Sequence, residues 1–301
     1  MIKELLAACG SRSRRPGCFH RLAHATAASS FLERSHEFFQ NRRSVMNTRY
    51  RILAFILGGV VLLICVIGYA YFRAESNPNA LWVIVQSCVS QAQAGHLMPG
   101  SCIAVDQHDR VAILRSIEGR EQFLLVPTIR VTGIEDAYVL KPAAPNYWAL
   151  AWTAALRYLP ADVSKDRTRI GLAINSEYGR SQNQLHIHIS CIKRSTADIL
   201  RGAQGQIGST WSAPAIVLGE HTYRAMRISG LTLGVVNPFA LAEKIPGASQ
   251  HMGSHTLVLV GAAWDDARPG FYLLDDVAHQ EDDTFDRGHG EALLDEDCSS
   301  H

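Results

Sequence analysis

An uninterrupted apolar stretch near the amino end places the strongest constraint on this chain. Residues 52–72, ILAFILGGVVLLICVIGYAYF, contain no charged side chain. At about 1.5 Å of rise per residue, a helix of this length spans the roughly 30 Å hydrocarbon core of a bilayer. A buried core helix would rarely run this long without a polar face, and a cleaved signal sequence has a shorter apolar core followed by small residues. We therefore predict an uncleaved transmembrane helix at residues 52–72.

Basic residues are concentrated on the amino side of this stretch. Residues 42–51 contain four arginines, whereas Arg73 on the other side is soon followed by Glu75. The positive-inside rule then predicts a cytoplasmic amino terminus and places everything from about residue 77 outside the cytoplasm. The net charge of +1 gives no whole-chain argument for nucleic acid, and none is expected as a partner.

The chain divides by composition into three parts. Residues 1–45 are rich in Arg, Ser and His with weak periodicity, and we expect a disordered or untranslated extension, because Met46 begins what looks like a complete start. Residues 46–76 form a cytoplasmic stub and the membrane anchor. Residues 77–301 form the outer domain. Its acidic end, residues 275–297 with ten Asp or Glu and one Arg, is expected to be solvated and mobile.

The outer domain has the pattern of an α+β fold built on an antiparallel sheet with packed helices. Helical spacing predicts helices at residues 79–89 and 146–159 and a weaker one at 196–202. Apolar runs bounded by turn residues predict strands at residues 111–117, 120–127, 169–175, 184–192, 255–264 and 270–277.

Four of the seven cysteines fall in the outer domain: Cys88, Cys102, Cys191 and Cys298. Four thiols in an oxidising compartment allow three pairings. Proximity in the sequence favours Cys88 with Cys102, which leaves Cys191 for Cys298. None of them has the C-x-x-C spacing of a zinc ribbon.

His186 and His188 are the candidate catalytic residues. Side chains alternate along a strand, so both imidazoles point to one face, while Leu185 and Ile187 point to the other. They can be hydrogen-bonded surface histidines, or two ligands of a metal whose third ligand is His221, His251 or His255, or a nucleophile with its partner. Spacing alone does not choose among these alternatives.

The residues before the histidines strengthen the third alternative. Asn175 precedes His186 by eleven residues and Gln182 precedes it by four, with Gly179 between them. This pattern resembles the active-site segment of the histidine triad (HIT) superfamily, although Ser190 occupies the position of the third histidine. The resemblance implies a HIT-like antiparallel sheet.

Longer segments are similar to a narrower family, the bacterial CDP-diacylglycerol pyrophosphatases. The similarity comprises the amino-terminal anchor, the four outer cysteines and residues 123–135, 173–192 and 237–260, and it extends from about Met46 to Cys298. It implies a hydrolase that releases CMP and phosphatidate from CDP-diacylglycerol held in the bilayer. The implied location is the bacterial inner membrane, with a single span and a periplasmic catalytic domain.

The resemblance also implies roles for individual residues. His188 would attack phosphorus and form a nucleotidyl-histidine intermediate, with a strand carbonyl fixing its tautomer and His186 supporting it. Neither a metal nor another cofactor is implied. The remaining candidates would bind the phosphate groups or lie near them: Asn175, Gln182, Asn183, Arg130, Ser190 and His251.

Two other functions stay open at this point. The covalent step can pass the cytidylyl group to an acceptor other than water. Alternatively, the domain can be an anchored module that binds nucleotide or lipid without turnover, a function that Ser190 favours because serine cannot act as the acid that a third histidine supplies.

Overall fold

The structure is a computed structural model that describes residues 50–67, 77–96, 100–213, 215–264, 268–281 and 284–299. It contains two compact units, residues 1–73 and residues 74–301. The predictions made for residues 1–45 and for the end of the apolar stretch, residues 68–72, lie outside the described residues.

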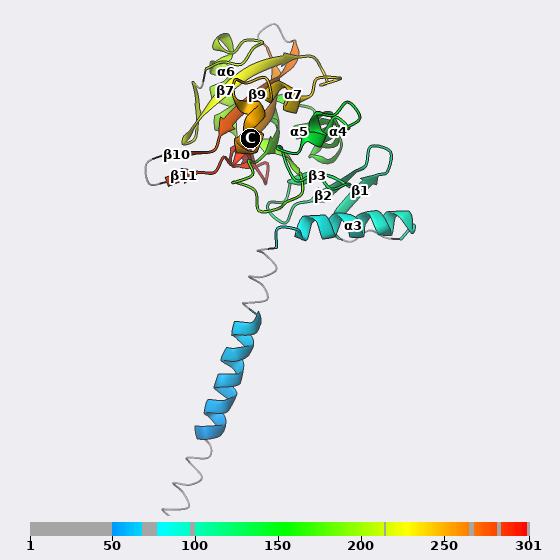
Figure 1. Ribbon diagram of the computed structural model, residues 1–301, viewed down its shortest axis with the longest axis vertical. Coiled ribbons are helices and arrows are strands. Elements are labelled where there is room, and N and C mark those ends of the chain that lie inside the picture. Colours follow the sequence, from blue (N-terminus) through cyan, green and yellow to red (C-terminus); the bar gives the residue numbers. More distant parts are fainter. Residues whose placement is uncertain are drawn as a thin grey trace, which may run out of the picture. The chain divides into compact units, whose positions relative to one another are not determined.

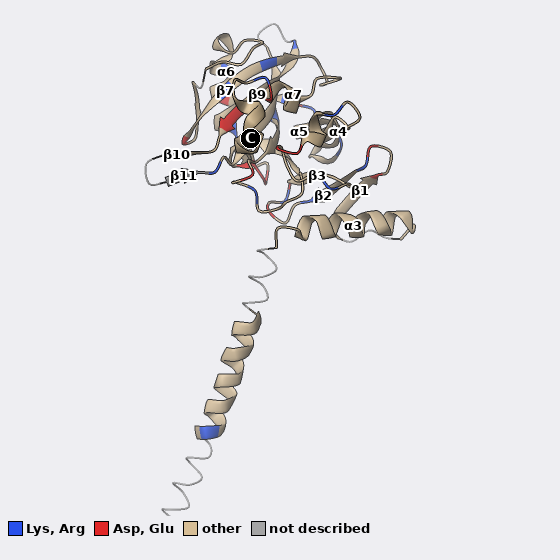
Figure 2. Cartoon of the chain, viewed as in Figure 1, with Lys and Arg blue, Asp and Glu red and all other residues tan. Residues whose placement is uncertain are grey.

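The first unit contains a single described helix, Tyr50–Ile67. Its side chains are all exposed, and Arg51 is its one charged residue, seen as the blue segment in Figure 2. By length and composition this helix can cross a membrane, and a signal sequence meets the same criterion. The predicted apolar helix is therefore present, while its function as an anchor stays a prediction.

Strands dominate the second unit (Figure 1). Ten of those in the described residues form one sheet in the order β1-β2-β3-β5-β4-β8-β9-β7-β6, with β12 also paired to β5, and β10 and β11 form a separate pair. Every pairing is antiparallel. The strands are β1 (Cys102–Asp106), β2 (Val111–Arg115), β3 (Phe123–Pro127), β4 (Ile170–Ile174), β5 (Ile187–Ile192), β6 (Ile216–Leu218), β7 (His221–Ser229), β8 (His255–Ala263), β9 (Pro269–Val277), β10 (His279–Glu281), β11 (Thr284–Asp286) and β12 (Leu294–Asp295).

Helices are few and short. The described α-helices are α3 (Ala80–Gln93), α4 (Tyr147–Tyr158), α5 (Ala161–Ser164), α6 (Arg194–Gly202) and α7 (Pro238–Ala242). Among the 3-10 helices, η7 (Gly290–Leu293) matters for the site. Asn146 caps α4 by accepting a hydrogen bond from the Ala149 amide, which satisfies one of the free donors of its first turn. Figure 1 shows α3 beside β1 and β2, where Leu81 and Val85 fill a small core.

The two faces of the sheet are both covered, so its central strands are buried on both sides. On one face, Trp148 and Trp152 of α4 pack into the largest apolar cluster, where the Trp152 ring meets Phe271 edge to face at 4.8 Å. Leu185 and Ile187 belong to this cluster. The other face packs a second cluster around α6 and the C-terminal residues. His188, which alternates with Ile187, therefore faces the C-terminal side.

The structure confirms the predicted α+β class and most of the predicted elements. It starts the histidine strand later than predicted, and it contains strands that were not predicted: β1, β6, β7, β10, β11 and β12. The histidine strand begins at Ile187 and not at residue 184, because the Leu185 N–H donates to the Val131 carbonyl (2.7 Å), beyond the end of β3, and not to a paired strand. The Gln184 side-chain amide also donates to the carbonyls of Pro127 (2.9 Å) and Ile129 (2.8 Å). The nine-residue strand β7 was not predicted, since its arginines interrupt the apolar pattern.

The prediction of a solvated, mobile acidic end was wrong. Asp275 and Asp276 are buried in β9, and β12 pairs with β5 through Leu294 and Asp295. Lys193 adds two bonds, from its amide to the Leu293 carbonyl at 2.9 Å and from its ammonium to the Ala292 carbonyl at 2.6 Å. The described acidic residues of β9 and of residues 291–297 therefore belong to folded segments, the second of which returns to the histidine strand.

Two disulfides confirm the favoured pairing. Cys88 is bonded to Cys102, and Cys191 is bonded to Cys298. The first bond links α3 to β1. The second links β5 to the C-terminal segment, which holds that segment beside the histidines.

We predict that the two disulfides differ in their contribution to stability. The Cys191–Cys298 bond closes 107 residues and the Cys88–Cys102 bond closes 14. Removing a native disulfide usually lowers the free energy of unfolding by about 2–5 kcal/mol. Because the loss grows with the length of the closed loop, we expect Cys298→Ala to lose roughly 2 kcal/mol more than Cys102→Ala. Urea unfolding of both variants measures the difference. An equal or smaller loss in Cys298→Ala would contradict this account.

Candidate active site

His186, immediately before β5, and His188, within β5, lie side by side. Their ring centroids lie 4.9 Å apart at 63°, an edge-to-face arrangement. His186 is 8% exposed and His188 is 6% exposed, so neither is a surface histidine. The Nδ1 atom of His186 lies 2.8 Å from the Gln184 carbonyl, which makes that nitrogen the protonated one in the neutral ring.

The Nδ1 atom of His188 faces a carboxylate. Glu291 Oε2 lies 3.0 Å from it, and the Gln122 side-chain amide lies 3.3 Å from it. A strand carbonyl was expected in this place, and that expectation was wrong: the carbonyl partner belongs to His186. A carboxylate fixes the Nδ1-protonated form more strongly than a carbonyl does, because it also attracts the charge that the ring gains in a reaction.

The Nε2 atom of His188 is buried and has no hydrogen-bond partner among the residues that the structure describes. A buried imidazole nitrogen without a partner is costly in free energy. With Nδ1 protonated and facing Glu291, Nε2 carries the lone pair. The arrangement leaves one nucleophilic or proton-accepting atom ready for a ligand.

Asn175 holds Glu291 in place from both sides. Its amide nitrogen donates to Glu291 Oε1 at 2.9 Å, and its amide oxygen accepts from the Glu291 backbone N–H at 3.3 Å. Burial raises the pKa of Glu291, but the contacts with His188, His289 and Asn175 outweigh burial and hold that pKa well below its usual value. Glu291 is therefore an anion at neutral pH, and it supplies the negative charge of the site.

Close backbone packing brings the two halves of the site together. The Ser176 N–H donates to the Gly288 carbonyl at 3.3 Å, and the Thr256 hydroxyl donates to the same carbonyl at 2.7 Å. A Cβ atom added at Gly179 would lie 2.5 Å from the Gly288 carbonyl oxygen. Glycine at position 179 is thus required by this close approach.

Ser190 connects the histidine strand to its neighbours. Its hydroxyl lies 3.0 Å from the Glu121 carbonyl and 2.9 Å from the Asp295 carbonyl. These contacts place Ser190 between β12 and the residues that precede β3. Its hydroxyl therefore holds the segment that carries Glu291.

The other predicted site residues lie elsewhere. Gln182 accepts from the Leu81 N–H at 2.9 Å and donates to the Asn77 carbonyl at 3.1 Å, and the Asn183 N–H donates to the Pro78 carbonyl at 2.6 Å. Arg130 is exposed, and its guanidinium contacts Asn79 and lies 5.5 Å from the Trp82 ring centroid. The structure thus joins these three residues to α3 and the residues just before it.

His251 and the other proposed metal ligands are not gathered around the paired histidines. His251 is exposed, and no side-chain contact is found for it in the described part of the chain. His255 contacts Asp275 at 2.6 Å and His221 contacts Asp276 at 3.3 Å. Within the described residues, the one group of three possible metal ligands is Asp106, His108 and Asp109.

Sequence reasoning missed Glu291, Gln122 and Arg180. Arg180 makes two bonds to Glu135, at 2.6 and 2.7 Å, and its charge contributes to lowering the pKa of His186. The disulfide offered a signal for Glu291, because pairing Cys191 with Cys298 brings the acidic segment next to the histidine strand. No comparable signal pointed to Gln122, which reaches the site from just before β3.

An open groove of about 690 Å³ lies beside Glu291. It is lined by Glu118, Lys193, His221, His289, Glu291, Ala292, Leu294, Asp295, Glu296 and Asp297. Glu291 thus lies between the buried His188 ring and an opening wide enough for a small molecule.

A buried imidazole with one nitrogen on a carboxylate and the other unpaired is typical of enzymes that use histidine as a nucleophile or base. A sequence model of the family described as CDP-diacylglycerol pyrophosphatase matches residues 76–301. A CDP-diacylglycerol pyrophosphatase of Yersinia pestis is 36% identical over 262 residues, covering 85% of this chain and 96% of that protein. The chain belongs to the CDP-diacylglycerol pyrophosphatase family, whose members are hydrolases acting on a diphosphate bond.

The buried state of His186 predicts a pH-dependent stability. Burial, with a further contribution from His188, lowers the pKa of His186 from 6.5 to about 4. The unfolded chain therefore binds a proton at higher pH than the folded chain does, so stability falls as the pH drops from 6.5 through about 4. This residue alone accounts for a loss of roughly 3 kcal/mol over that range.

Urea unfolding of the wild type and of His186→Gln at pH 7 and at pH 4 measures this loss. Other groups titrate in both proteins, so the difference between them isolates His186. We expect the variant to lose less unfolding free energy on acidification. The same pH dependence in both proteins would show that His186 is not held neutral by burial.

The contact between Glu291 and His188 predicts a selective loss of turnover. Glu291→Gln keeps the shape and the bonds to Asn175 but removes the negative charge, so kcat for diphosphate hydrolysis should fall on the order of 10²-fold with little change in KM. Initial rates over a range of substrate concentrations measure both constants. Glu220→Gln, at an exposed carboxylate outside this groove, serves as the control and should leave kcat unchanged. Equal effects of the two substitutions would exclude a specific role for Glu291.

Proposed function

We propose that this protein hydrolyses CDP-diacylglycerol to CMP and phosphatidate through a covalent intermediate on His188. Membership of the family supports the reaction, and the name of the Yersinia pestis relative supports the substrate. One observation supports the covalent step: His188 Nε2 is buried without a partner while its Nδ1 faces Glu291.

In the first step, the lone pair of His188 Nε2 attacks the phosphorus that carries the cytidine. A bond forms between nitrogen and phosphorus, and the bond from that phosphorus to the bridging oxygen breaks. The oxygen leaves with the electron pair as part of phosphatidate, whose phosphate is a good leaving group. The ring keeps its proton on Nδ1 and becomes cationic, and the Glu291 carboxylate stabilises this charge.

In the second step, water attacks the same phosphorus. Its oxygen bonds to phosphorus, the bond between nitrogen and phosphorus breaks, and Nε2 regains its lone pair. One water proton passes to solvent, and CMP leaves. Dividing the reaction in this way replaces one difficult displacement by two easier ones.

His186 acts as a neutral neighbour in this mechanism. Its pKa of about 4 keeps it uncharged near neutral pH, so it does not oppose the positive charge that His188 gains. Its Nδ1 proton is directed at the Gln184 carbonyl, which leaves Nε2 as an acceptor. An acceptor does not bind a phosphate oxygen, so we assign His186 to orienting His188.

Five residues were expected to bind phosphate groups: Asn175, Gln182, Asn183, Arg130 and Ser190. We now assign Asn175 and Ser190 to holding Glu291 and its segment, since their polar groups already have partners there. Gln182, Asn183 and Arg130 are proposed to hold the start of α3.

We further propose that the Tyr50–Ile67 helix anchors the enzyme in the inner membrane, with the catalytic domain in the periplasm. The arginines before the helix support this orientation. A diacyl substrate stays in the bilayer, so an anchor raises its effective concentration at the active site.

Trapping the intermediate tests the mechanism. CDP-diacylglycerol labelled with ³²P in the phosphate next to cytidine is mixed with enzyme and denatured in alkali, because bonds between phosphorus and histidine nitrogen are labile in acid. We expect label on His188 in the wild type. His188→Ala should carry none, and its CMP release should fall on the order of 10³-fold or more.

His96→Ala, at an exposed histidine, serves as the control and should behave as the wild type does. CMP release at the ordinary rate in His188→Ala would refute the mechanism. Complete loss of wild-type activity in chelator would favour a metal-dependent reaction, and nucleotide binding without CMP release would favour a binding module. A cytidylyl product formed with inorganic phosphate as acceptor would favour transfer over hydrolysis.

A further inference from the structure

Gln122 is a buried glutamine beside His188 whose side-chain oxygen has no hydrogen-bond partner. It lies immediately before β3 and is 0% exposed, and its Oε1 atom finds no partner among the residues that the structure describes. Its amide nitrogen lies 3.3 Å from His188 Nδ1. A buried amide with an unpartnered oxygen costs free energy, so packing alone does not explain a glutamine at this position.

The charge of Glu291 determines which atom of this amide faces the ring. Glu291 Oε2 lies 3.0 Å from His188 Nδ1, and an anion so close favours a proton on that nitrogen. A protonated Nδ1 is a donor, so it gains no hydrogen bond from the N–H groups of the Gln122 amide. Rotation of the amide by half a turn exchanges its nitrogen and its oxygen, and Oε1 then accepts from the Nδ1–H group.

The rotated amide is the more favourable of the two orientations. One end of the amide has no described partner in either orientation. In the rotated form the other end gains a hydrogen bond to His188, whereas in the first form two donors face each other. The difference of one buried hydrogen bond therefore selects the orientation with the oxygen on Nδ1.

We propose that Gln122 is a positioning residue, which holds the His188 ring for attack by accepting a hydrogen bond from its Nδ1–H group. This proposal rests on the proposed covalent function of His188. Glu291 and Gln122 act differently: the carboxylate balances the charge that the ring gains, and the neutral amide fixes the direction of the ring. A ring held by one contact can swing about its side-chain bonds, whereas contacts from two elements fix it.

The backbone delivers the Gln122 amide to the ring in a fixed register. Strand β3 pairs with β5 so that Leu124 lies directly opposite His188. Gln122 is two residues before Leu124, so it is the diagonal neighbour of His188 on the same face of the sheet. The preceding Glu121 N–H donates to the Glu296 carbonyl at 2.8 Å, which ties this point of the chain to the segment that carries Glu291.

Kinetics of three variants test the proposal, with CMP release from CDP-diacylglycerol as the assay. Gln122→Met keeps the size of the side chain without the amide, and Gln122→Asn keeps an amide that is too short to reach the ring. Both should lower kcat roughly ten- to a hundredfold with little change in KM, because the lost hydrogen bond is made to a ring that becomes charged. Gln122→Glu should recover most of this loss, since a carboxyl group offers an acceptor oxygen in either charge state.

A spectroscopic measurement tests the hydrogen bond without turnover. Full-length protein with ¹⁵N-labelled histidine is studied by nuclear magnetic resonance in detergent micelles at about pH 8, where an ordinary imidazole is neutral. The signals that disappear in His188→Ala belong to His188. We expect its proton on Nδ1 in the wild type, and exchange of that proton with water should be faster in Gln122→Met than in the wild type or in Gln122→Glu.

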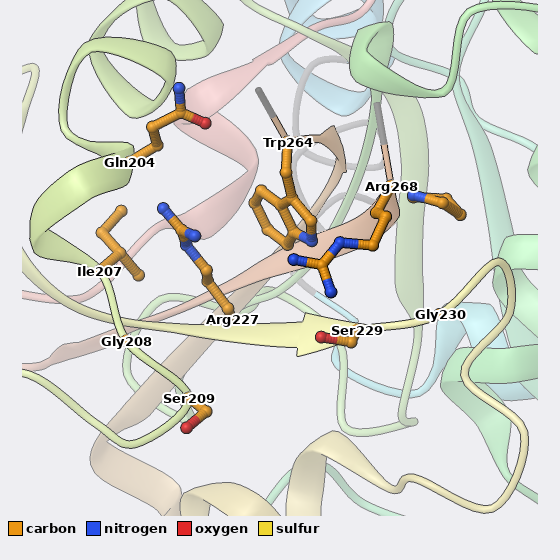
Figure 3. A pocket seen from close by; sticks show the side chains of 10 residues that line it. Gln204, Ile207, Gly208, Ser209, Arg227, Ser229, Gly230, Trp264 and Arg268 are labelled. Atoms are coloured by element: carbon orange, nitrogen blue, oxygen red, sulfur yellow. The ribbon is translucent and has the colours of Figure 1, made fainter. Parts of the chain in front are cut away.

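Gln204→Met is the matched control. Gln204 is a half-buried glutamine on the wall of the cavity shown in Figure 3, whose lining residues include neither His188 nor Glu291. This variant should keep the kcat of the wild type and its rate of Nδ1 proton exchange. An equal loss of kcat in Gln204→Met and Gln122→Met would overturn the proposal, because the effect would then not be specific to the histidine.

Three other results would also overturn it. They are wild-type kcat in Gln122→Met and Gln122→Asn, an equal loss of kcat in Gln122→Glu, and a wild-type spectrum with the proton on Nε2 of His188. The ³²P label separates these results from a failure of the covalent mechanism. Label on His188 together with any of them refutes only the function of Gln122, whereas absence of label from wild-type His188 refutes the covalent step itself.

Discussion

The contact between the Glu291 carboxylate and His188 Nδ1 is the interaction on which the site depends. It joins a residue of the central strand β5 to one from the C-terminal segment, and it lies where water has little access. Asn175 donates to the Oε1 atom of this carboxylate, and the His188 ring lies 3.0 Å from its Oε2 atom. The same contact leaves Nε2 of His188 as the one ring atom free for chemistry.

Several independent constraints keep this contact in register. Pairing of β12 with β5, the Cys191–Cys298 bond and the Ser190 hydroxyl all hold the C-terminal segment to the histidine strand. The close approach of Gly179 to Gly288 holds it to the loop before that strand. Catalytic geometry tolerates errors of only about half an ångström, which explains why so many constraints converge on one segment.

The sequence predicted the elements whose patterns are local. Alternation of side chains placed both histidines on one face, and helical spacing with Asn146 as a cap located α4. The partners of His188 were not predictable in this way, because Glu291 lies 103 residues further along the chain and Gln122 lies 66 residues before it. Only the strand order brings them together.

Charge composition misled the reading of the chain's end. Acidic residues usually remain in water, and a run of them normally marks a solvated segment. Here the consecutive leucines Leu293 and Leu294, at the junction of η7 and β12, are buried. The two leucines were the local sequence signal that this segment folds. Two apolar residues among so many acidic ones were too few to predict a buried segment from the sequence.

The late position of Glu291 in the chain has a consequence for biosynthesis. Most of the sheet is complete once the ribosome has passed β9, yet the carboxylate that prepares His188 arrives afterwards. A nascent or prematurely terminated polypeptide therefore carries His188, the proposed nucleophile, without Glu291. Such a product lacks the carboxylate beside His188, so we expect it to be inactive even where its sheet is in place.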